Sequence, residues 1–194
     1  MDLNLKHQLN CQNMKIEKAK IEDSTVLIVD GIPQSVYPTT YGGYWQHMIP
    51  EDFKGKDVLL LGVGAGTIAR LLLEKYPNVK IIGVDNNQEV INAALDNFKL
   101  GDIKMKIEIA DGFAYVKSTN KMFDLILCDM WDGGTFPFKV LMSDFIEDCK
   151  KRLNEDGQVY INCPNLDYLA NESMKGFKAL RDDIGRNLIY HWEK

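Results

Sequence analysis

Apolar and polar residues alternate along this chain in blocks that predict strands separated by helices. Short uninterrupted apolar runs are typical of buried parallel strands, and apolar residues that recur every three or four positions are typical of amphipathic helices. The expected strands after residue 50 cover 58–61, 79–84, 104–110, 123–129, 158–163 and 187–192. The expected helices are one containing Ile68, Leu71 and Leu72, one running from Val90 to Phe98 with Gly101 as its C′ residue, and those at 113–118, 139–153 and 174–184. This order predicts an α/β fold of the Rossmann-like type, with a mainly parallel sheet and helices on both faces.

The first fifty residues carry a different pattern. Segments 15–22 and 25–30 are expected to form a β-hairpin, and Asp30-Gly31 makes another turn. The aromatic segment 41–49 is expected to form a short helix or a lid. We therefore expect an N-terminal β-hairpin cap with a lid segment at 1–50, followed by an α/β domain at 51–194.

Closely spaced glycines follow the strand at 58–61. Gly62, Gly64 and Gly66 are expected to form a tight turn ahead of a helix whose first N–H groups are free, which lets the backbone approach a ligand. A dinucleotide site requires G-x-G-x-x-G, but Thr67 stands where the third glycine would be. The G-x-G-x-G spacing resembles motif I of the class I S-adenosylmethionine-dependent methyltransferases. A tight turn that binds nothing is the alternative.

Acidic residues end successive strands of the predicted sheet. Asp85, Asp111 and Asp129 each follow a strand, and the carboxyl ends of parallel strands meet at the edge where ligands bind. Asp85 is placed to accept hydrogen bonds from two ribose hydroxyls, whereas Asp111 alone reads equally well as a turn residue. Asp129 could take a proton from an attacking amine, and with Asp132 it could hold a cationic substrate. A solvated acidic loop is the alternative, and Trp131 between them either walls the pocket or covers the core.

Composition narrows the range of partners. The chain has 194 residues and a formal net charge of −5, which argues against nucleic acid or an anionic membrane as the main partner. Its four cysteines include no C-x-x-C pair, so we expect reduced thiols in a cytoplasmic protein. Its three histidines lie far apart, so no metal site is expected. No signal peptide or membrane span is visible in the sequence.

Several segments, taken in order, carry a resemblance to the spermidine synthases. L-I-V-D-G-I-P-Q-S at 27–35 resembles the L-x-x-D-G-x-x-Q-S of that family, and G-V-G-A-G-T at 62–67 stands where the family has G-G-G-D-G-G. V-D-N-N-Q-E-V at 84–90 is similar to its V-E-I-D-x-x-V, and I-A-D-G at 109–112 to its G-D-G/A segment. D-M-W-D at 129–132 falls where the family has D-S-x-D-P. The resemblance implies the polyamine-synthase branch of the methyltransferase superfamily.

The resemblance also implies roles for particular residues. Gln34 and Asp85 would contact the nucleoside sugar, Asp111 would hold the adenine, Asp129 would be the catalytic acid or base, and Asp132 would bind the substrate amine. The expected cofactor-binding set is Gln34, Gly62, Gly64, Ala65, Gly66, Asp85, Asn86, Asp111, Gly112 and Asp129. The expected substrate-binding set is Tyr44, Trp131 and Asp132.

Departures from the family pattern bear on the expected reaction. Ala65 stands where the family has an Asp that binds the aminopropyl amine, and Gly133 stands where it has Pro. These departures favour a methyltransferase that uses S-adenosylmethionine and acts on a small acceptor, possibly of the amine class. Aminopropyl transfer from decarboxylated S-adenosylmethionine to a diamine is the first alternative, and a non-catalytic nucleoside-binding module is the second. The expected partner is a small-molecule acceptor, and the sequence leaves a homodimer open.

Overall fold

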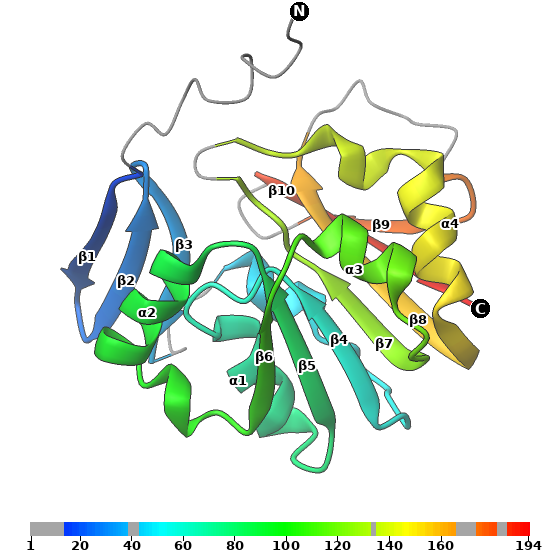
Figure 1. Ribbon diagram of the computed structural model, residues 1–194, viewed down its shortest axis with the longest axis horizontal. Coiled ribbons are helices and arrows are strands. Elements are labelled where there is room, and N and C mark those ends of the chain that lie inside the picture. The colour runs from blue at the N-terminus through cyan, green and yellow to red at the C-terminus, as the bar shows by residue number, and fades with distance from the viewer. Residues whose placement is uncertain (1–13, 39–42, 133–134, 166–173, 182–185) are drawn as a thin grey trace, which may run out of the picture.

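Two β-sheets form the frame of the molecule (Figure 1). The computed structural model describes residues 14–38, 43–132, 135–165, 174–181 and 186–194. Within these ranges, no helix combines the length and the apolar character that crossing a membrane requires. The cysteines of the described ranges, Cys128, Cys149 and Cys163, are buried free thiols, and Cys11 lies outside those ranges.

The smaller sheet is an antiparallel meander of β1 (Ile16–Ile21), β2 (Ser24–Val29) and β3 (Ile32–Tyr37). The predicted hairpin is confirmed, but the third strand was not predicted. Asp30 and Gly31 join β2 to β3 with φ angles of 49° and 80°, the positive values that a two-residue hairpin turn requires. Pro33 is tolerated in β3 because this strand lies at the edge of its sheet, where a missing N–H costs little.

The larger sheet has seven strands in the order β6-β5-β4-β7-β8-β10-β9. Neighbours from β6 to β8 pair in parallel, whereas β10 pairs antiparallel with both β8 and β9. The chain runs outward from β4 in both directions, so the strand order reverses between β4 and β7. Its strands are β4 (Asp57–Leu61), β5 (Lys80–Asp85), β6 (Met105–Ile109), β7 (Phe123–Cys128), β8 (Leu153–Pro164), β9 (Lys178–Arg181) and β10 (Asn187–Glu193).

Helices cover both faces of this sheet, as predicted. Alternate residues of β4 serve the two faces: Leu59 and Leu61 pack in one buried cluster with α3 and α4, and Val58 and Leu60 pack in another with α1. The α-helices are α1 (Thr67–Lys75), α2 (Gln88–Asn97), α3 (Gly112–Ser118) and α4 (Ser143–Lys151). Short 3₁₀ helices are η1 (Tyr44–Met48), η2 (Leu100–Asp102) and η3 (Phe138–Leu141).

The segment expected to form a short helix or a lid folds mainly as the short helix η1. Trp45 and Met48 are buried in the same cluster as α1, so this segment is part of the core. Residues 41 and 42, which the prediction also included in this segment, lie outside the described residues. A further buried cluster joins Leu27 and Val29 of the small sheet to residues of α2. The expected domain boundary after residue 50 stays a prediction.

Three sequence predictions differ from the structure. The helix expected at 174–184 is wrong, because residues 178–181 pair with β10 as strand β9. The helix expected at 139–153 is divided into η3 and α4, and Leu153 already begins β8. Gly101 is not the C′ residue of α2, because that helix ends at Asn97 and Lys99 takes the left-handed conformation, with φ of 51°.

Candidate active site

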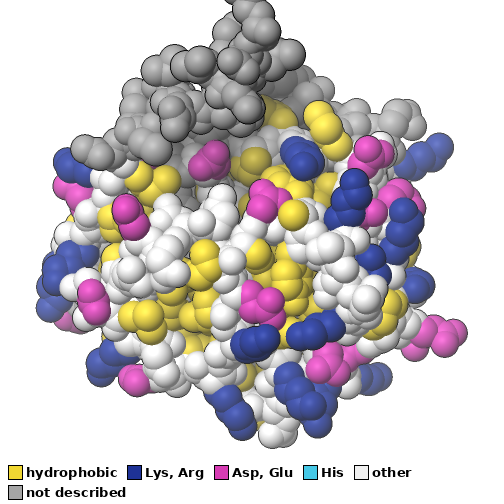
Figure 2. Space-filling model, in the orientation of Figure 1, with side chains coloured by type: hydrophobic (Ala, Val, Ile, Leu, Met, Phe, Trp, Pro, Cys, Tyr) yellow, Lys and Arg dark blue, Asp and Glu magenta, His cyan; other side chains and the backbone are white. Residues whose placement is uncertain are grey.

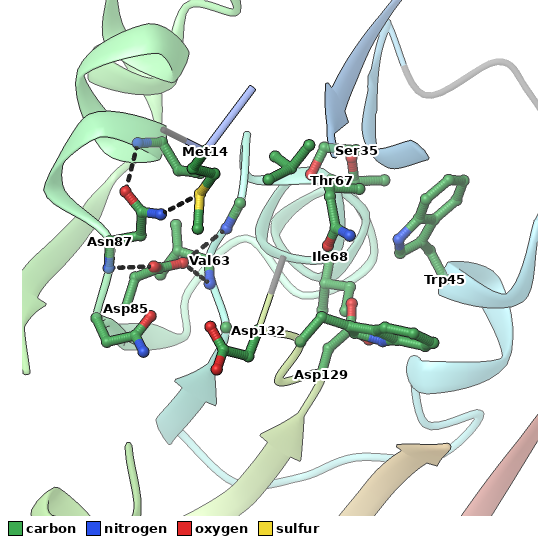
Figure 3. A pocket seen from close by; sticks show the side chains of 17 residues that line it. Met14, Ser35, Trp45, Val63, Thr67, Ile68, Asp85, Asn87, Asp129 and Asp132 are labelled. Atoms are coloured by element: carbon green, nitrogen blue, oxygen red, sulfur yellow. Dashed lines mark hydrogen bonds between the residues drawn. The ribbon is translucent and has the colours of Figure 1, made fainter. Parts of the chain in front are cut away.

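A cavity opens at the carboxyl edge of the large sheet, where β4, β5 and β7 end (Figure 3). This is the position where the strand order reverses, at which open α/β sheets bind their ligands. Both sheets contribute to its lining: Met14, Val29, Gln34, Ser35, Trp45, Gly62, Val63, Gly64, Thr67, Ile68, Asp85, Asn86, Asn87, Val90, Asp129, Trp131 and Asp132. A neighbouring pocket shares part of this set and adds Val84, Asp111, Gly112, Phe113, Met130 and Pro137. Of the predicted site residues, the two pockets bring together all except Tyr44, Ala65 and Gly66.

The glycine turn between β4 and α1 forms one wall of the cavity. Gly62 has a φ of 85°, and a Cβ on it would lie 2.2 Å from the carbonyl oxygen of Asp129. A Cβ on Gly64 would lie 2.6 Å from Oγ of Ser35. The same Oγ accepts a hydrogen bond from the backbone N–H of Ala65 at 2.9 Å. The turn therefore fits tightly between β3 and the end of β7, with no side chain between its backbone and the cavity at these two positions.

Ala65 and Gly66 lie outside the two pockets, in contrast to the prediction that they bind the cofactor. Ala65 has no exposed surface and packs in a buried apolar cluster with Leu27 and Val90. A Cβ on Gly66 would lie 2.5 Å from the side chain of Ile103. The conformation of the turn sets these directions, so position 65 contributes to the core and not to the cavity lining.

Asp85 holds the glycine turn from the end of β5. Its Oδ2 accepts hydrogen bonds from the backbone N–H groups of Val63 at 2.9 Å and Gly64 at 3.1 Å. Its Oδ1 accepts one from the backbone N–H of Asn87 at 2.9 Å. A carboxylate has about four acceptor positions, so these internal bonds leave about one for a ligand hydroxyl. Asp85 thus orders the turn, and it has room for one ribose hydroxyl where the sequence predicted two.

Asp129 follows β7, and two side chains hold its carboxylate. The hydroxyl of Tyr44 donates to Oδ1 at 3.1 Å and to Oδ2 at 3.0 Å, and the amide of Asn162 donates to Oδ1 at 2.7 Å. Burial raises the pKa of Asp129 from 3.8 to about 6, although both donors oppose this shift. Burial, together with the charge of Asp129, also raises the pKa of Tyr44 well above its ordinary value. At neutral pH Asp129 is therefore ionised, and it is a stronger base than an ordinary aspartate.

The remaining predicted residues border both pockets or the second one. Trp131 lines both pockets and also packs edge-to-face against Phe136 of the core, with ring centroids 5.7 Å apart, so both of its predicted roles hold. Asp132 is exposed and lines both pockets. Asp111 caps α3 by accepting a hydrogen bond from the backbone N–H of Ala114 at 2.7 Å, and it also lines the second pocket.

Sequence reasoning missed several residues of the site. Ser35 and Asn87 lie inside motifs that were recognised, and both support the backbone around the cavity. Trp45 belongs to the aromatic segment expected to form a short helix or a lid, and this aromatic composition was a usable signal for a pocket wall. Met14 accepts a hydrogen bond from the amide of Asn87 at 2.8 Å, and Asn162 lies in an apolar strand. Neither of these two carried a signal in the sequence, because only the tertiary fold brings them to the site.

The charge of the site has one sign within the described residues. The charged side chains that line the two pockets are Asp85, Asp111, Asp129 and Asp132. Lysines lie instead beside the amino ends of the strands, at Lys56, Lys80 and Lys104. On the face shown in Figure 2, Lys and Arg side chains lie along the lower edge and also along the right side. In the described part of the chain, no group of three or more His, Cys, Asp or Glu residues could hold a metal ion.

Comparison with solved structures defines the class of fold. A probable spermidine synthase from Corynebacterium glutamicum superimposes with a TM-score of 0.76 at 21% sequence identity, covering 94% of this chain and 77% of that one. Human methyltransferase-like protein 13 superimposes with a TM-score of 0.62 at 19% identity, covering 75% of this chain and 74% of that one. The fold is thus the Rossmann-like fold of the methyltransferases.

Sequence comparison then defines the family. The model of the spermine/spermidine synthase domain matches residues 39–183, so this chain belongs to the spermine/spermidine synthase family. The polyamine aminopropyltransferase of Chromobacterium violaceum is 37% identical over 110 residues, which cover 55% of this chain and 42% of that protein. The polyamine aminopropyltransferase of Thermococcus kodakarensis is 28% identical over 149 residues, covering 71% of this chain and 51% of that protein. The chain spans 23% to 42% of the length of the first curated relatives it matches. These relatives agree better with the aminopropyl alternative than with the methyl transfer expected first.

Proposed function

We propose that this chain is an aminopropyltransferase that uses decarboxylated S-adenosylmethionine and a small amine acceptor. The charge of the candidate site carries the proposal, because all the charged side chains lining the two pockets in the described ranges are carboxylates. Such a site favours cationic ligands, and an aminopropyl donor and a polyamine acceptor are both cations. The names of the curated relatives support the same reaction.

Charge also separates the two candidate donors. Both carry a sulfonium and an ammonium group, but intact S-adenosylmethionine carries a carboxylate as well. At an effective dielectric of about 20, two like charges about 6 Å apart repel by about 3 kcal/mol. Solvent in the open cavity reduces this value, but a site lined by several carboxylates still favours the decarboxylated donor. We expect that donor to bind at least tenfold more tightly, which corresponds to about 1.4 kcal/mol.

The residues present fit a nucleoside donor. Asp85 keeps about one acceptor position for a ribose hydroxyl, and Gln34 lines the same cavity. Gly62 presents bare backbone between the two pockets. The second pocket combines the apolar side chains of Phe113 and Met130 with polar groups, a composition suited to a flat base with a polar edge. These residues would hold the donor across the end of β4.

The carboxylate of Asp129 supplies the acid–base chemistry. When bound, the donor supplies a carbon made electrophilic by the adjacent sulfonium. The attacking amine must lose a proton, because an ammonium nitrogen has no free electron pair. Asp129 accepts this proton, and the freed electron pair of the nitrogen then forms the new C–N bond as the C–S bond breaks with its electron pair passing to sulfur. Tyr44 holds the carboxylate in place, and Asp132 at the exposed side can pair with a second ammonium group of the acceptor.

Methyl transfer from intact S-adenosylmethionine is the second candidate function. The observation that favours it is Ala65, because this residue offers no carboxylate where the family has one for the amine of the donor. The structure weakens this argument. Ala65 is fully buried outside the two pockets, so the charge of the cavity depends on the aspartates and not on position 65.

Product analysis tests the proposal directly. The purified chain is incubated with a linear diamine and with either decarboxylated or intact S-adenosylmethionine, and the amine product is identified by mass spectrometry. Addition of an aminopropyl group that depends on Asp129 supports the proposal. Asp124→Asn is the matched control, because Asp124 lies at the opposite end of β7 and outside the two pockets. A methylated product replaces the proposal by the second candidate, and binding of either donor without product leaves a nucleoside-binding module.

A further inference from the structure

A chain of hydrogen-bonded side chains leads from the candidate base into the outer strands of the large sheet. Asn162 on β8 is almost completely buried, with 1% of its surface exposed. Its amide N–H donates to Oδ1 of Asp129 at 2.7 Å, and its Oδ1 accepts from the amide N–H of Asn187 on β10 at 2.9 Å. A buried amide requires partners for both of its ends, and here both ends have one.

Strand pairing places these side chains next to one another. Cys128 of β7 pairs with Ile161 of β8, so the residues that follow them, Asp129 and Asn162, lie side by side. On the other side, Asn187 of β10 pairs with Pro164, two residues beyond Asn162 and therefore on the same face. The chain of hydrogen-bonded side chains thus follows from the backbone geometry of three adjacent strands.

The orientation of the Asn162 amide determines what Asp129 meets. With the observed orientation, a donor faces the carboxylate and an acceptor faces the N–H of Asn187. The reverse orientation would oppose oxygen to a charged oxygen, and an NH₂ group to the NH₂ of Asn187. Asn187 therefore fixes the direction of the Asn162 amide through its hydrogen bond to Oδ1 of Asn162.

The two oxygens of Asp129 are consequently unequal. Oδ1 accepts from both Asn162 and Tyr44, whereas Oδ2 accepts from Tyr44. We propose that Asn162, oriented by Asn187, is a positioning residue that anchors Oδ1 and turns Oδ2 toward the acceptor amine. The inference rests on the proposed function for the identity of that amine, but not for the effect of Asn162 on the carboxylate.

The same contact influences protonation. A hydrogen bond donated to a carboxylate favours its charged form, so the Asn162 amide lowers the pKa of Asp129 against the rise caused by burial. Removal of the amide should therefore raise this pKa further. Titratable groups on the surrounding elements include Tyr44 on η1, Cys128 on β7, Tyr160 and Cys163 on β8, and Tyr190 and His191 on β10. Asp85 and Asp132 line the same cavity as Asp129.

A matched pair of substitutions tests the inference. Asn162→Leu keeps the approximate shape and removes the donor. Asn154→Leu is the control, because Asn154 on β8 donates to Oδ1 of Asp124 on β7 at 2.7 Å, an equivalent pair at the other end of the same two strands. Asn187→Ala is a milder variant that keeps the Asn162 amide but removes its orienting donor, and it serves if Asn162→Leu does not fold.

The first measurement is the titration of the Asp129 carboxylate, followed by carbon NMR in the protein without ligands. We expect the midpoint to move to a pH about one unit higher in Asn162→Leu, by less in Asn187→Ala, and not at all in Asn154→Leu. An unchanged midpoint in both Asn162→Leu and Asn187→Ala would overturn the inference. This measurement needs no turnover, so it decides the inference even if the wild-type chain transfers no aminopropyl group.

The second measurement separates positioning from binding. We expect kcat to fall by about tenfold to 100-fold in Asn162→Leu, as misplacement of a reacting group does. The Kd of the donor should change by less than about threefold, because Asn162 does not line either pocket. On the acidic side of the pH profile of kcat, the midpoint should move to higher pH together with the NMR midpoint. An equal loss in donor affinity and in kcat would show a general structural defect and refute the positioning role.

Discussion

Replacement of Asp129 by Asn should make the fold more stable at neutral pH. The pKa of Asp129 is raised from 3.8 to about 6 because burial disfavours its charged form. A carboxyl group with a raised pKa stabilises the folded state most when it is protonated, and this contribution is lost as the pH rises from about 3.8 through about 6. At pH 7.5 the loss amounts to at most about 3 kcal/mol, since one pKa unit corresponds to about 1.4 kcal/mol. An uncharged Asn avoids this cost.

Urea denaturation at two pH values measures the effect. At pH 7.5 we expect the free energy of unfolding to be about 1–3 kcal/mol higher for Asp129→Asn than for the wild type. At pH 4 the difference should shrink, because folded wild-type Asp129 is then protonated. At pH 7.5 turnover should fall strongly in Asp129→Asn, while the affinity for the donor stays within a few-fold.

Asp124→Asn is a control on the same strand, for which we expect the free energy of unfolding to change in the opposite direction. Burial alone would raise the pKa of Asp124, but the backbone N–H groups of Asp57 and Lys56 and the amide of Asn154 outweigh it and lower the pKa. Asp124→Asn should therefore be less stable than the wild type at pH 7.5, and this deficit should shrink as the pH falls through the pKa of Asp124. If Asp129→Asn were no more stable than the wild type at pH 7.5, the reasoning from burial would be refuted.

Substitutions at three further positions test the glycine turn. Asp85→Ala should weaken donor binding by about 1.5–3 kcal/mol in calorimetric titration. It should also lower the free energy of unfolding, because Val63 and Gly64 lose their acceptor; unchanged stability would contradict the role of Asp85 in ordering the turn. Ala65→Asp should lower soluble yield and thermal stability by burying an unpaired charge, whereas Ala65→Ser should be tolerated better; a stable Ala65→Asp protein would place this side chain in the cavity after all. Gly62→Ala should abolish donor binding or folding, because its φ is positive and its Cβ would collide with a backbone carbonyl, and wild-type affinity in this variant would contradict the turn geometry.

The sequence predicted the parallel part of the sheet well because apolar runs report burial on both faces. It failed at 174–184, where apolar residues follow a helical spacing but residues 178–181 pair with β10. That pairing is a tertiary contact that local periodicity does not record. The missed strand β3 has the same cause in part, because Pro33 opposes a strand locally and only its place at the sheet edge permits one.

The candidate site divides along similar lines. Asp85 and Asp129 could be predicted because parallel strands bring their carboxyl ends together, a rule that needs no side-chain detail. The direction of Ala65 could not be predicted, because it depends on the dihedral angles of a tight turn. Asn162 and Asn187 could not be found either, since their role depends on which strands become neighbours.

The amide–carboxylate pairs at both ends of β7 and β8 also bear on how the sheet assembles. Between them, β7 presents only aliphatic residues at 125–127, which would pack almost equally well if the strand slipped by two positions. A slip would leave the buried amide of Asn162 without its acceptor, at a cost of about 1–3 kcal/mol, and would break the pair between Asn154 and Asp124 as well. The polar pairs at the two ends thus mark the correct alignment of the aliphatic stretch between them. The residue that positions the candidate base therefore also helps the nascent chain to reject misaligned sheets.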